Sequence, residues 1–328
     1  MNNRRKFIVA LGAGVLGAPI AFAQQQGKFW RIGYLGDGSA SARASSTLEP
    51  FRKGLRDLGY VEGRNIVIDA RWSEGKSERL SEFAAEFVQL KVDIIVTHGV
   101  PGSNAAKTAT TSIPIVVASA ADMVGSGLVA SLARPGGNVT GTSDQITEIS
   151  SKEVELLSEL LPKLQHVGVL WNRRNPGAIR TAETVQTAAR ERKWRVSSLS
   201  IANPDEIETT IESAVKGSAR ALIVVHDPMI LTHRIRIAQS ALKNGLPTIC
   251  ASSLLAEAGG LLSYGPDLTN LFERAAIFVD RIIKGRKPAD IPVEQPTKFE
   301  MVLNVKTAKA LGLTIPQLIL SRVDRTIE

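Results

Sequence analysis

Short β-branched segments alternate with longer amphipathic segments along most of the chain, and this alternation constrains the fold more than any single motif. It is the pattern of a parallel sheet covered by helices. The pattern restarts near residue 145, so we predict an α/β fold of two doubly wound parallel-sheet domains. The strands are predicted at 30–35, 65–70, 92–96 and 113–117 in the first unit, and at 166–170, 194–199, 221–225 and 247–250 in the second.

Apolar residues recur at helical spacing between these strands. Leu48, Phe51 and Leu55 share one face of a helix predicted over 48–58, and Gly59 is placed as its C-cap. Asn175 and Pro176 are placed as the N-cap and first residue of another helix. That helix is predicted at 176–192, and the other long helices are predicted at 80–90, 152–161, 204–215, 232–243 and 271–283.

The C-terminal tail is predicted to cross between the domains. A helix is followed by a proline-rich link at 287–296 and a strand at 299–303, so the chain crosses three times in all. We predict an N-terminal lobe of residues 28–144 plus 265–287 and a C-terminal lobe of residues 145–264 plus 288–328. Ligands of doubly wound sheets bind beyond the carboxyl ends of the strands, which predicts a cleft between the lobes.

The N-terminus has the three-part layout of a secretory signal peptide. The basic residues Arg4, Arg5 and Lys6 precede an apolar run at 7–22, which is too short for a comfortable membrane span and ends in a small-x-small triplet. We predict a signal peptide over residues 1–23, cleaved after Ala23, and a periplasmic mature chain. The basic start fits both Sec and twin-arginine export, and this choice stays open.

Composition argues against several classes of protein. Lys and Arg number 40 against 32 Asp and Glu; the predicted signal peptide holds three of the basic residues and no acidic one, which leaves 37 against 32. This excess is spread along the chain without a basic run interleaved with aromatics, so we predict no nucleic-acid binding. The glycine pattern at 12–17 lies in the signal core and not between a strand and a helix, so no dinucleotide cofactor is predicted. No metal site is expected.

Two loops after predicted strands of the first unit are candidates for ligand contact. Asp37 and Ser39 follow the first strand, where such residues serve either a ligand or the turn itself. Gly99, Pro101 and Ser103 follow the third strand, in a turn whose free N–H groups suit a carboxylate. Ser103 either contacts the ligand or caps the helix.

One further candidate of the first unit and three of the second remain, each with a second interpretation. Asp122 either receives an ammonium group or holds the hinge. Asn172 has the better claim on a ligand because Asn175 is used as the cap. Asp227 either accepts a ligand amine or forms the turn before Pro228. Tyr264 either closes over a bound solute or packs at the hinge.

His226 and Asp227 invite a catalytic interpretation as a base beside its orienting acid. Neighbours on an extended chain point to opposite faces, and neither a serine elbow nor a spaced metal cluster accompanies them. We therefore predict that the chain is not an enzyme. The alternative is an exported enzyme on a doubly wound scaffold that uses this pair.

Four stretches closely resemble the ABC transporter substrate-binding proteins of the tryptophan-binding or unknown-ligand group. They are GLRDLGYVEGRNI at 54–66, GSGLVASLARPGGNVTG at 125–141, SYGPD at 263–267 and PVEQPTKFE at 292–300. The resemblance implies a type I periplasmic-binding fold, solute capture by domain closure, and delivery to ABC permease and ATPase subunits. We expect a monomer that binds a small molecule, with an amino acid or a small aromatic acid favoured.

The chain departs from the family pattern at one position. Met123 follows Asp122 where the family commonly has proline, which adds a flexible apolar side chain and a free backbone N–H. If Met123 faces the cleft, it is expected to shift ligand preference.

Overall fold

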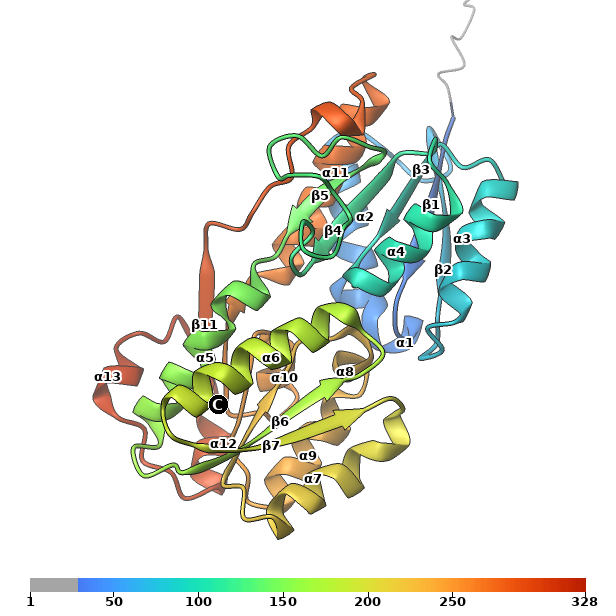
Figure 1. Ribbon diagram of the computed structural model, residues 1–328. Helices are drawn as coiled ribbons and strands as arrows, with labels where there is room; N and C mark the ends of the chain where they lie inside the picture. The colour runs from blue at the N-terminus through green and yellow to red at the C-terminus, as the bar shows by residue number, and fades with distance from the viewer. Residues whose placement is uncertain (1–28) are drawn as a thin grey trace, which may run out of the picture.

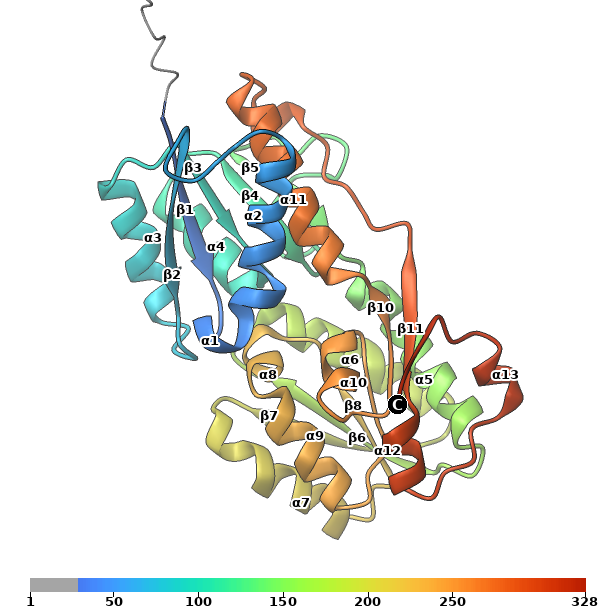
Figure 2. The same ribbon diagram turned by 180° about the vertical axis from the view of Figure 1, so that it is seen from behind.

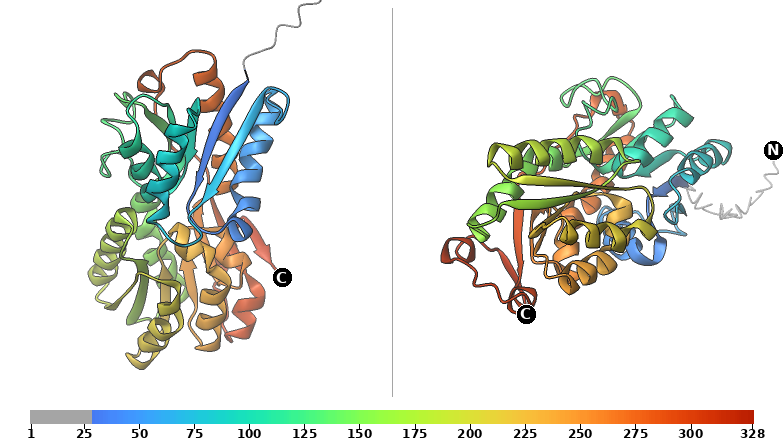
Figure 3. Two further views of the ribbon diagram at one scale, coloured as in Figure 1. Left: turned by 90° about the vertical axis from the view of Figure 1, so that its right-hand side faces the viewer. Right: turned by 60° about the horizontal axis from the view of Figure 1, so that its bottom comes forward.

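The computed structural model describes residues 29–328, which form two α/β lobes stacked along the long axis of the molecule (Figure 1). Each lobe is a sheet with helices on both faces (Figure 3). This architecture confirms the predicted fold class. The predicted signal peptide, residues 1–23, lies outside the described residues.

The N-terminal lobe is built on a five-stranded sheet in the order β2-β1-β3-β4-β5, with all neighbours parallel. Alternate side chains of a strand face opposite sides of a sheet. Tyr34 therefore packs with α2 and α11 on one face, and Leu35 packs with α3 and α4 on the other. The strands are β1 (Trp30–Gly36), β2 (Ile66–Trp72), β3 (Ile94–Thr97), β4 (Ile115–Ala120) and β5 (Val139–Ser143), and the helices are α1 (Ala40–Arg43), η1 (Ala44–Ser46), α2 (Leu48–Asp57), α3 (Arg79–Gln89), α4 (Gly99–Ala109) and α11 (Leu268–Ile283).

The C-terminal lobe is built on a seven-stranded sheet in the order β12-β11-β10-β9-β8-β6-β7. Its strands are β6 (His166–Asn172), β7 (Arg195–Ile201), β8 (Ala221–Val224), β9 (Thr248–Cys250), β10 (Leu262–Pro266), β11 (Phe299–Asn304) and β12 (Arg325–Ile327). Its helices are α5 (Ile146–Leu160), α6 (Pro176–Glu191), η2 (Pro204–Glu206), α7 (Ile207–Lys216), α8 (Pro228–Thr232), α9 (Arg234–Lys243), α10 (Ser253–Glu257), α12 (Val305–Ala310) and α13 (Gln317–Leu320). Within residues 29–328 no helix is long and apolar enough to cross a membrane.

Two strands of this sheet do not follow the predicted parallel arrangement. β11 runs antiparallel to β10. β12 pairs parallel with β11, so it also runs opposite to the rest of the sheet. The chain leaves β10 toward the N-terminal lobe and re-enters the sheet from there, so β11 has to run away from that lobe. An antiparallel neighbour needs no crossover helix within the same lobe.

The chain crosses between the lobes three times, as Figure 2 shows for the stretches around β10 and β11. The first crossing joins β5 to α5, the second joins β10 to α11 at Asp267, and the third lies at residues 295–298. Asp267 caps α11 by accepting a hydrogen bond from the backbone N–H of Asn270 at 3.1 Å.

The lobe boundaries predicted at 264/265 and 287/288 differ from those observed. Pro266 still pairs with Phe299 in the C-terminal sheet. Residues 288–294, with the short helix η3 (Pro288–Asp290), lie on the N-terminal lobe, where Thr140 donates to the Ile291 carbonyl at 2.8 Å and Glu294 N–H donates to the Gly141 carbonyl at 2.9 Å. A proline-rich link has no hydrophobic period, so its lobe is decided by these tertiary contacts.

Candidate functional site

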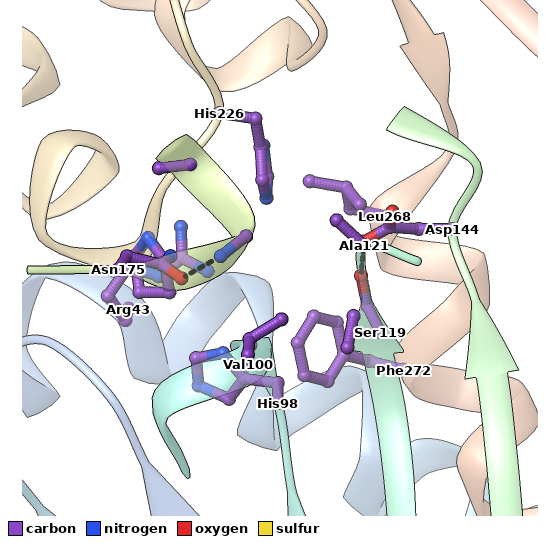
Figure 4. Close-up of a pocket in the computed structure, with 15 residues that line it drawn as sticks. Arg43, His98, Val100, Ser119, Ala121, Asp144, Asn175, His226, Leu268 and Phe272 are labelled. Atoms are coloured by element: carbon purple, nitrogen blue, oxygen red, sulfur yellow. Dashed lines mark hydrogen bonds between the residues drawn. The ribbon is translucent and has the colours of Figure 1, made fainter. Parts of the chain in front are cut away.

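A small cavity lies where the two lobes face each other, beyond the carboxyl ends of strands from both sheets (Figure 4). Its volume is about 30 Å³, which is room for roughly two waters. The N-terminal lobe contributes Arg43, His98, Gly99, Val100, Ser119, Ala120, Ala121, Leu268 and Phe272, and the C-terminal lobe contributes Asn175, Gly177, Ala178, His226 and Pro228. Asp144, at the first crossing, completes the lining.

The lobes are closed around this cavity. A Cβ atom at Gly177 would lie 3.0 Å from a methyl of Val100, and one at Gly38 would lie 2.3 Å from Oγ1 of Thr232. Only glycine permits backbone of one lobe to approach the other so closely. Arg234 of α9 also donates to the Ala42 carbonyl across the interface at 3.2 Å.

Asp37 follows β1 and lies just behind the cavity wall. Its carboxylate accepts a hydrogen bond from the Ser73 hydroxyl at 2.9 Å, and its backbone N–H donates to Nε2 of His98 at 3.3 Å. Burial, together with the nearby charge of Asp227, raises the pKa of Asp37 to about 6. The bond to His98 identifies Nε2 as an acceptor and fixes that ring.

Asp227 holds together the part of the site that comes from the C-terminal lobe. Its carboxylate accepts from the side-chain amides of Asn172 at 3.2 Å and Asn175 at 2.8 Å, and from the backbone N–H of Ile230 at 3.0 Å as the N-cap of α8. Burial raises the pKa of this carboxyl, and the hydrogen bonds oppose that rise. Asp227 thereby fixes both asparagines, and Asn175 caps α6 through Gly177 as predicted.

Arg43, at the end of α1, brings a buried cation to the cavity. Its exposed fraction is 2%, and among residues 29–328 its Nε and Nη1 atoms have no hydrogen-bond partner. Burial lowers the pKa of Arg43 to about 10, so the guanidinium stays charged at neutral pH. A buried charge without hydrogen bonds is costly unless something pairs with it.

His226 enters the cavity from the opposite lobe (Figure 4). Burial and the charge of Arg43 lower the pKa of His226 to about 3, so the ring is neutral at pH 7. Its Nδ1 atom is buried and has no partner within the described chain. This nitrogen is available to a molecule in the cavity.

Asp144 and Ser119 form an acidic corner. The Ser119 hydroxyl donates to Oδ2 of Asp144 at 2.7 Å, and the Ile146 N–H donates to Oδ1 at 3.1 Å. Burial raises the pKa of Asp144 to about 6. In Figure 4 this corner lies across the cavity from Arg43 and Asn175.

Of the nine predicted ligand contacts, only Gly99 lines the cavity. Asp37, Asn172 and Asp227 lie behind its wall and hold other residues in place. The remaining five are used elsewhere. Ser39 lies at the surface hydrogen-bonded to Ser41, Pro101 lies within α4, Ser103 donates to the Gly99 carbonyl, Asp122 caps a turn and faces Arg180, and Tyr264 stacks on Phe299.

Met123 does not face the cleft. Its side chain is fully buried in the hydrophobic cluster of the N-terminal lobe that includes Leu128 and Val129. The methionine that stands where the family commonly has proline therefore packs in that core and not against a ligand.

Arg43, Asp144 and Phe272 are among the cavity residues that were missed from the sequence. Arg43 lies on a four-residue helix without a periodic pattern, and Asp144 lies at a crossing. Phe272 lies in the helix predicted at 271–283, whose periodicity indicates an apolar face but not which of its residues reaches a cavity. The one available signal was that Arg43 is the only charged residue in the stretch 38–48.

Two features expected of an enzyme site are a metal cluster and a bonded acid–base pair. Within the part of the chain that the structure describes, no three His, Cys, Asp or Glu side chains are grouped to hold a metal ion. Asp227 bonds to Asn172, Asn175 and Ile230, while Nδ1 of His226 is unpartnered. A base oriented by a bonded acid, which the enzyme alternative requires, is not formed by these two residues.

Comparison with known proteins identifies the family. The family model described as "ABC transporter substrate binding protein" matches residues 42–327. A curated relative, the "Tyrosine-binding protein" of Clostridioides difficile (strain R20291), is 32% identical over 263 residues, which cover 80% of this chain and 75% of the relative.

Two solved structures show the lobe arrangement of relatives. The ABC domain of Streptococcus pneumonia in complex with L-Trp is 27% identical with a TM-score of 0.84, and covers 92% of this chain and 100% of that one. The ligand-free, open structure of CD0873, a substrate-binding protein with adhesive properties from Clostridium difficile, is also 27% identical but has a TM-score of 0.64, covering 91% and 100%. The lobes here therefore stand closer to their arrangement in the tryptophan complex.

The fold is the type I periplasmic-binding fold. The matched family and the curated relative are substrate-binding proteins and not enzymes. Because the family model spans nearly all of the described residues and the relative covers four fifths of the chain, this protein belongs to the ABC transporter substrate-binding protein family.

Proposed function

We propose that this chain captures a free amino acid, with an aromatic one favoured, between its two lobes and delivers it to the permease and ATPase subunits of an ABC importer. The observation that carries the proposal is the composition of the interlobe cavity. Both lobes line it, charged groups lie at two of its sides, and the apolar side chains of Val100, Leu268 and Phe272 lie between. Amino acids carry the same combination of charged and apolar groups.

The names of two relatives support the choice of ligand class. One is called a tyrosine-binding protein, and another was solved in complex with L-Trp. Phe272 supplies an aromatic wall at the cavity, and ring stacking on such a wall favours aromatic ligands.

Capture requires the lobes to move. A cavity of about 30 Å³ is far smaller than an amino acid, so the ligand enters when the lobes are apart and the lobes then close around it less fully than here. A ligand that contacts both lobes stabilises the closed form, because it binds that form better than the open one. The permease then distinguishes the loaded protein by its shape.

The location follows from the same proposal. Substrate-binding proteins of ABC transporters work outside the cytoplasm, and we propose that the signal peptide is cleaved after Ala23 to release a periplasmic monomer. Mass spectrometry of the protein purified from the periplasm tests this, because the cleaved chain begins at Gln24. An uncleaved, membrane-attached chain would contradict it.

Thermal denaturation of the mature chain tests ligand capture. L-tyrosine and L-tryptophan should each raise the Tm, because a ligand at about 100 times its Kd adds roughly 2.7 kcal/mol to the stability. L-leucine and L-glutamate serve as comparisons, and the solute recovered afterwards should be unchanged. Failure of every amino acid to raise the Tm, or conversion of the bound molecule, would overturn the proposal.

A further inference from the structure

We propose that the cavity binds its amino acid in one orientation, as a zwitterion, with the carboxylate at Arg43 and the N-terminus of α4 and the ammonium group at Asp144. This inference rests on the proposed function and adds to it the residues that bind the two charged groups of the ligand. It predicts that the site binds molecules that carry only one of these charges more weakly than it binds the amino acid.

The first observation concerns the side chain of Arg43. Its guanidinium is 98% buried at the cavity wall, and two of its nitrogens have no hydrogen-bond partner among the residues described. Asp37 and Asp227 are close enough to influence its pKa, yet neither forms a salt bridge with it in the described chain. A bound carboxylate would supply the missing hydrogen bonds, in the planar geometry that guanidinium groups favour.

The start of α4 is the second observation. Gly99 and Val100 line the same cavity, and the helix runs for 11 residues. The side chain of His98 precedes the helix without capping it, and its Nε2 accepts a hydrogen bond from the backbone N–H of Asp37. Free N–H groups at the start of a helix attract an anion, so they act on the same ligand group as Arg43. Nδ1 of His226 adds a third unpartnered nitrogen.

The acidic corner is the third observation. Asp144 is 2% exposed, and its two oxygens accept hydrogen bonds from Ser119 and Ile146. A carboxylate can accept further bonds at each oxygen, and an ammonium group donates three. Asp144 and Ser119 lie across the cavity from Arg43 in Figure 4, so one small ligand can reach both ends.

The charges of Arg43 and Asp144 also favour a zwitterion over a ligand that carries only a carboxylate or only an ammonium group. A carboxylic acid without an amine would leave Asp144 buried with no cation, and an amine without a carboxylate would leave Arg43 without an anion. A buried charge that loses its partner is strongly destabilising. The carboxylate and the ammonium group of the ligand are therefore bound by different residues, and each of these contacts can be tested separately.

The experiment measures the binding of truncated ligands to variants of the two residues that are proposed to bind the charged groups. Calorimetry measures the affinity of L-tyrosine, of tyramine, which lacks the carboxylate, and of 3-(4-hydroxyphenyl)propionate, which lacks the amine. L-tryptophan, tryptamine and indole-3-propionate form a second series. The proteins are the full mature chain and its R43M and D144N variants. For the unaltered chain, each truncated ligand should bind roughly 10- to 100-fold more weakly than the amino acid.

The variants should lose affinity selectively. R43M should lose roughly 10- to 100-fold for the amino acid and for the propionate but little for the amine. D144N should lose a similar factor for the amino acid and for the amine but little for the propionate. R234Q is the matched control, because Arg234 contacts α1 from the other lobe through the Ala42 carbonyl and does not line the cavity. It should weaken all three ligands equally.

The outcomes separate the two proposals. If the unaltered chain binds no amino acid, the proposed function fails. If it binds amino acids but R43M weakens all ligands of a series equally, or the two variants exchange their preferences, the orientation is wrong. Melting of each variant without ligand checks that it is folded, and R43K provides a second variant that keeps the charge if R43M does not fold.

Discussion

Asp37 and Asp227 approach each other from opposite lobes, and both carboxyl groups are almost completely buried in the closed protein. Asp37 lies after β1 of the N-terminal lobe, and Asp227 caps α8 of the C-terminal lobe. Burial and then the charge of Asp227 raise the pKa of Asp37 to about 6. Closing the lobes therefore brings two acidic groups together, at a cost in free energy that depends on pH.

The first prediction concerns this pH dependence. Against the ordinary Asp pKa near 4, Asp37 has a pKa of about 6 in the closed protein, and the part of this rise that comes from the charge of Asp227 makes Asp37 bind a proton more readily when the lobes are closed. The closed form is then favoured below pH 4, loses that advantage as the pH rises from 4 to 6, and changes little above 6. D37N should remove this penalty and favour closure at pH 7 by at most about 3 kcal/mol.

Small-angle X-ray scattering without ligand, recorded between pH 4 and pH 8, measures the closed fraction. The closed fraction of the unaltered chain should fall as the pH rises. D37N should lack the part of this fall that the ionisation of Asp37 causes. The Asn side chain can still accept from Ser73, so the local fold is kept. An identical pH profile for the two proteins would count against the role of Asp37.

The second prediction concerns the stability of the C-terminal lobe. D227A removes the acceptor for Asn172, Asn175 and the Ile230 N–H, and leaves buried donors without partners. The free energy of unfolding should fall by roughly 2–4 kcal/mol. D267A is the matched control, because Asp267 caps α11 in the same way but is exposed, and it should cost about 1 kcal/mol. Urea denaturation of both variants measures the difference, and equal losses would contradict it.

The third prediction concerns the contacts that hold the lobes closed. Arg180 faces Asp122 across the interface at 3.4 Å, and Arg234 donates to the Ala42 carbonyl. The double variant R180Q/R234Q should weaken every ligand by a similar factor, because each contact contributes about 1 kcal/mol or less to closure. R173Q breaks a pair with Glu206 inside one lobe and should leave affinity unchanged. A change confined to one ligand would show that the arginines act on the ligand instead.

The fourth prediction concerns the aromatic wall. F272L removes a ring that lines the cavity, and should lower the affinity for tyrosine and tryptophan by about tenfold while that for leucine changes little. F278L changes an equally buried ring on the same helix that does not line the cavity. Both should cost stability of about 1.5 kcal/mol or less. Equal effects of the two variants on tyrosine binding would refute a role for Phe272 in recognition.

Several predictions from the sequence depended only on local interactions and agree with the structure. Asn175 caps α6, and Gly59 follows α2 with a φ of 85°. Most strands and helices lie where periodicity indicated them. β5 (Val139–Ser143) was missed because Gly141 interrupts its run of β-branched residues, and α5 begins six residues before the predicted start, after the left-handed Gln145.

The candidate contacts were harder to predict, because a strand end indicates only the neighbourhood of a site. Asn172 ends β6 and Asp227 follows β8 in the C-terminal lobe, yet the two side chains bond to each other and leave the cavity wall to Asn175 and His226. Which side chain of a loop turns toward a ligand depends on the hydrogen bonds its neighbours make. Those bonds join residues more than 50 positions apart.

The sequence by itself determined the two βα units and the family, because local periodicity and contiguous motifs carry that information. The tertiary structure decided the rest. It reversed β11 because the chain returns from the other lobe, it kept residues 288–294 on the N-terminal lobe, and it brought Arg43, Asp144 and His226 to one cavity. These three residues are far apart in the chain and share a site only because two separately folded lobes close on each other.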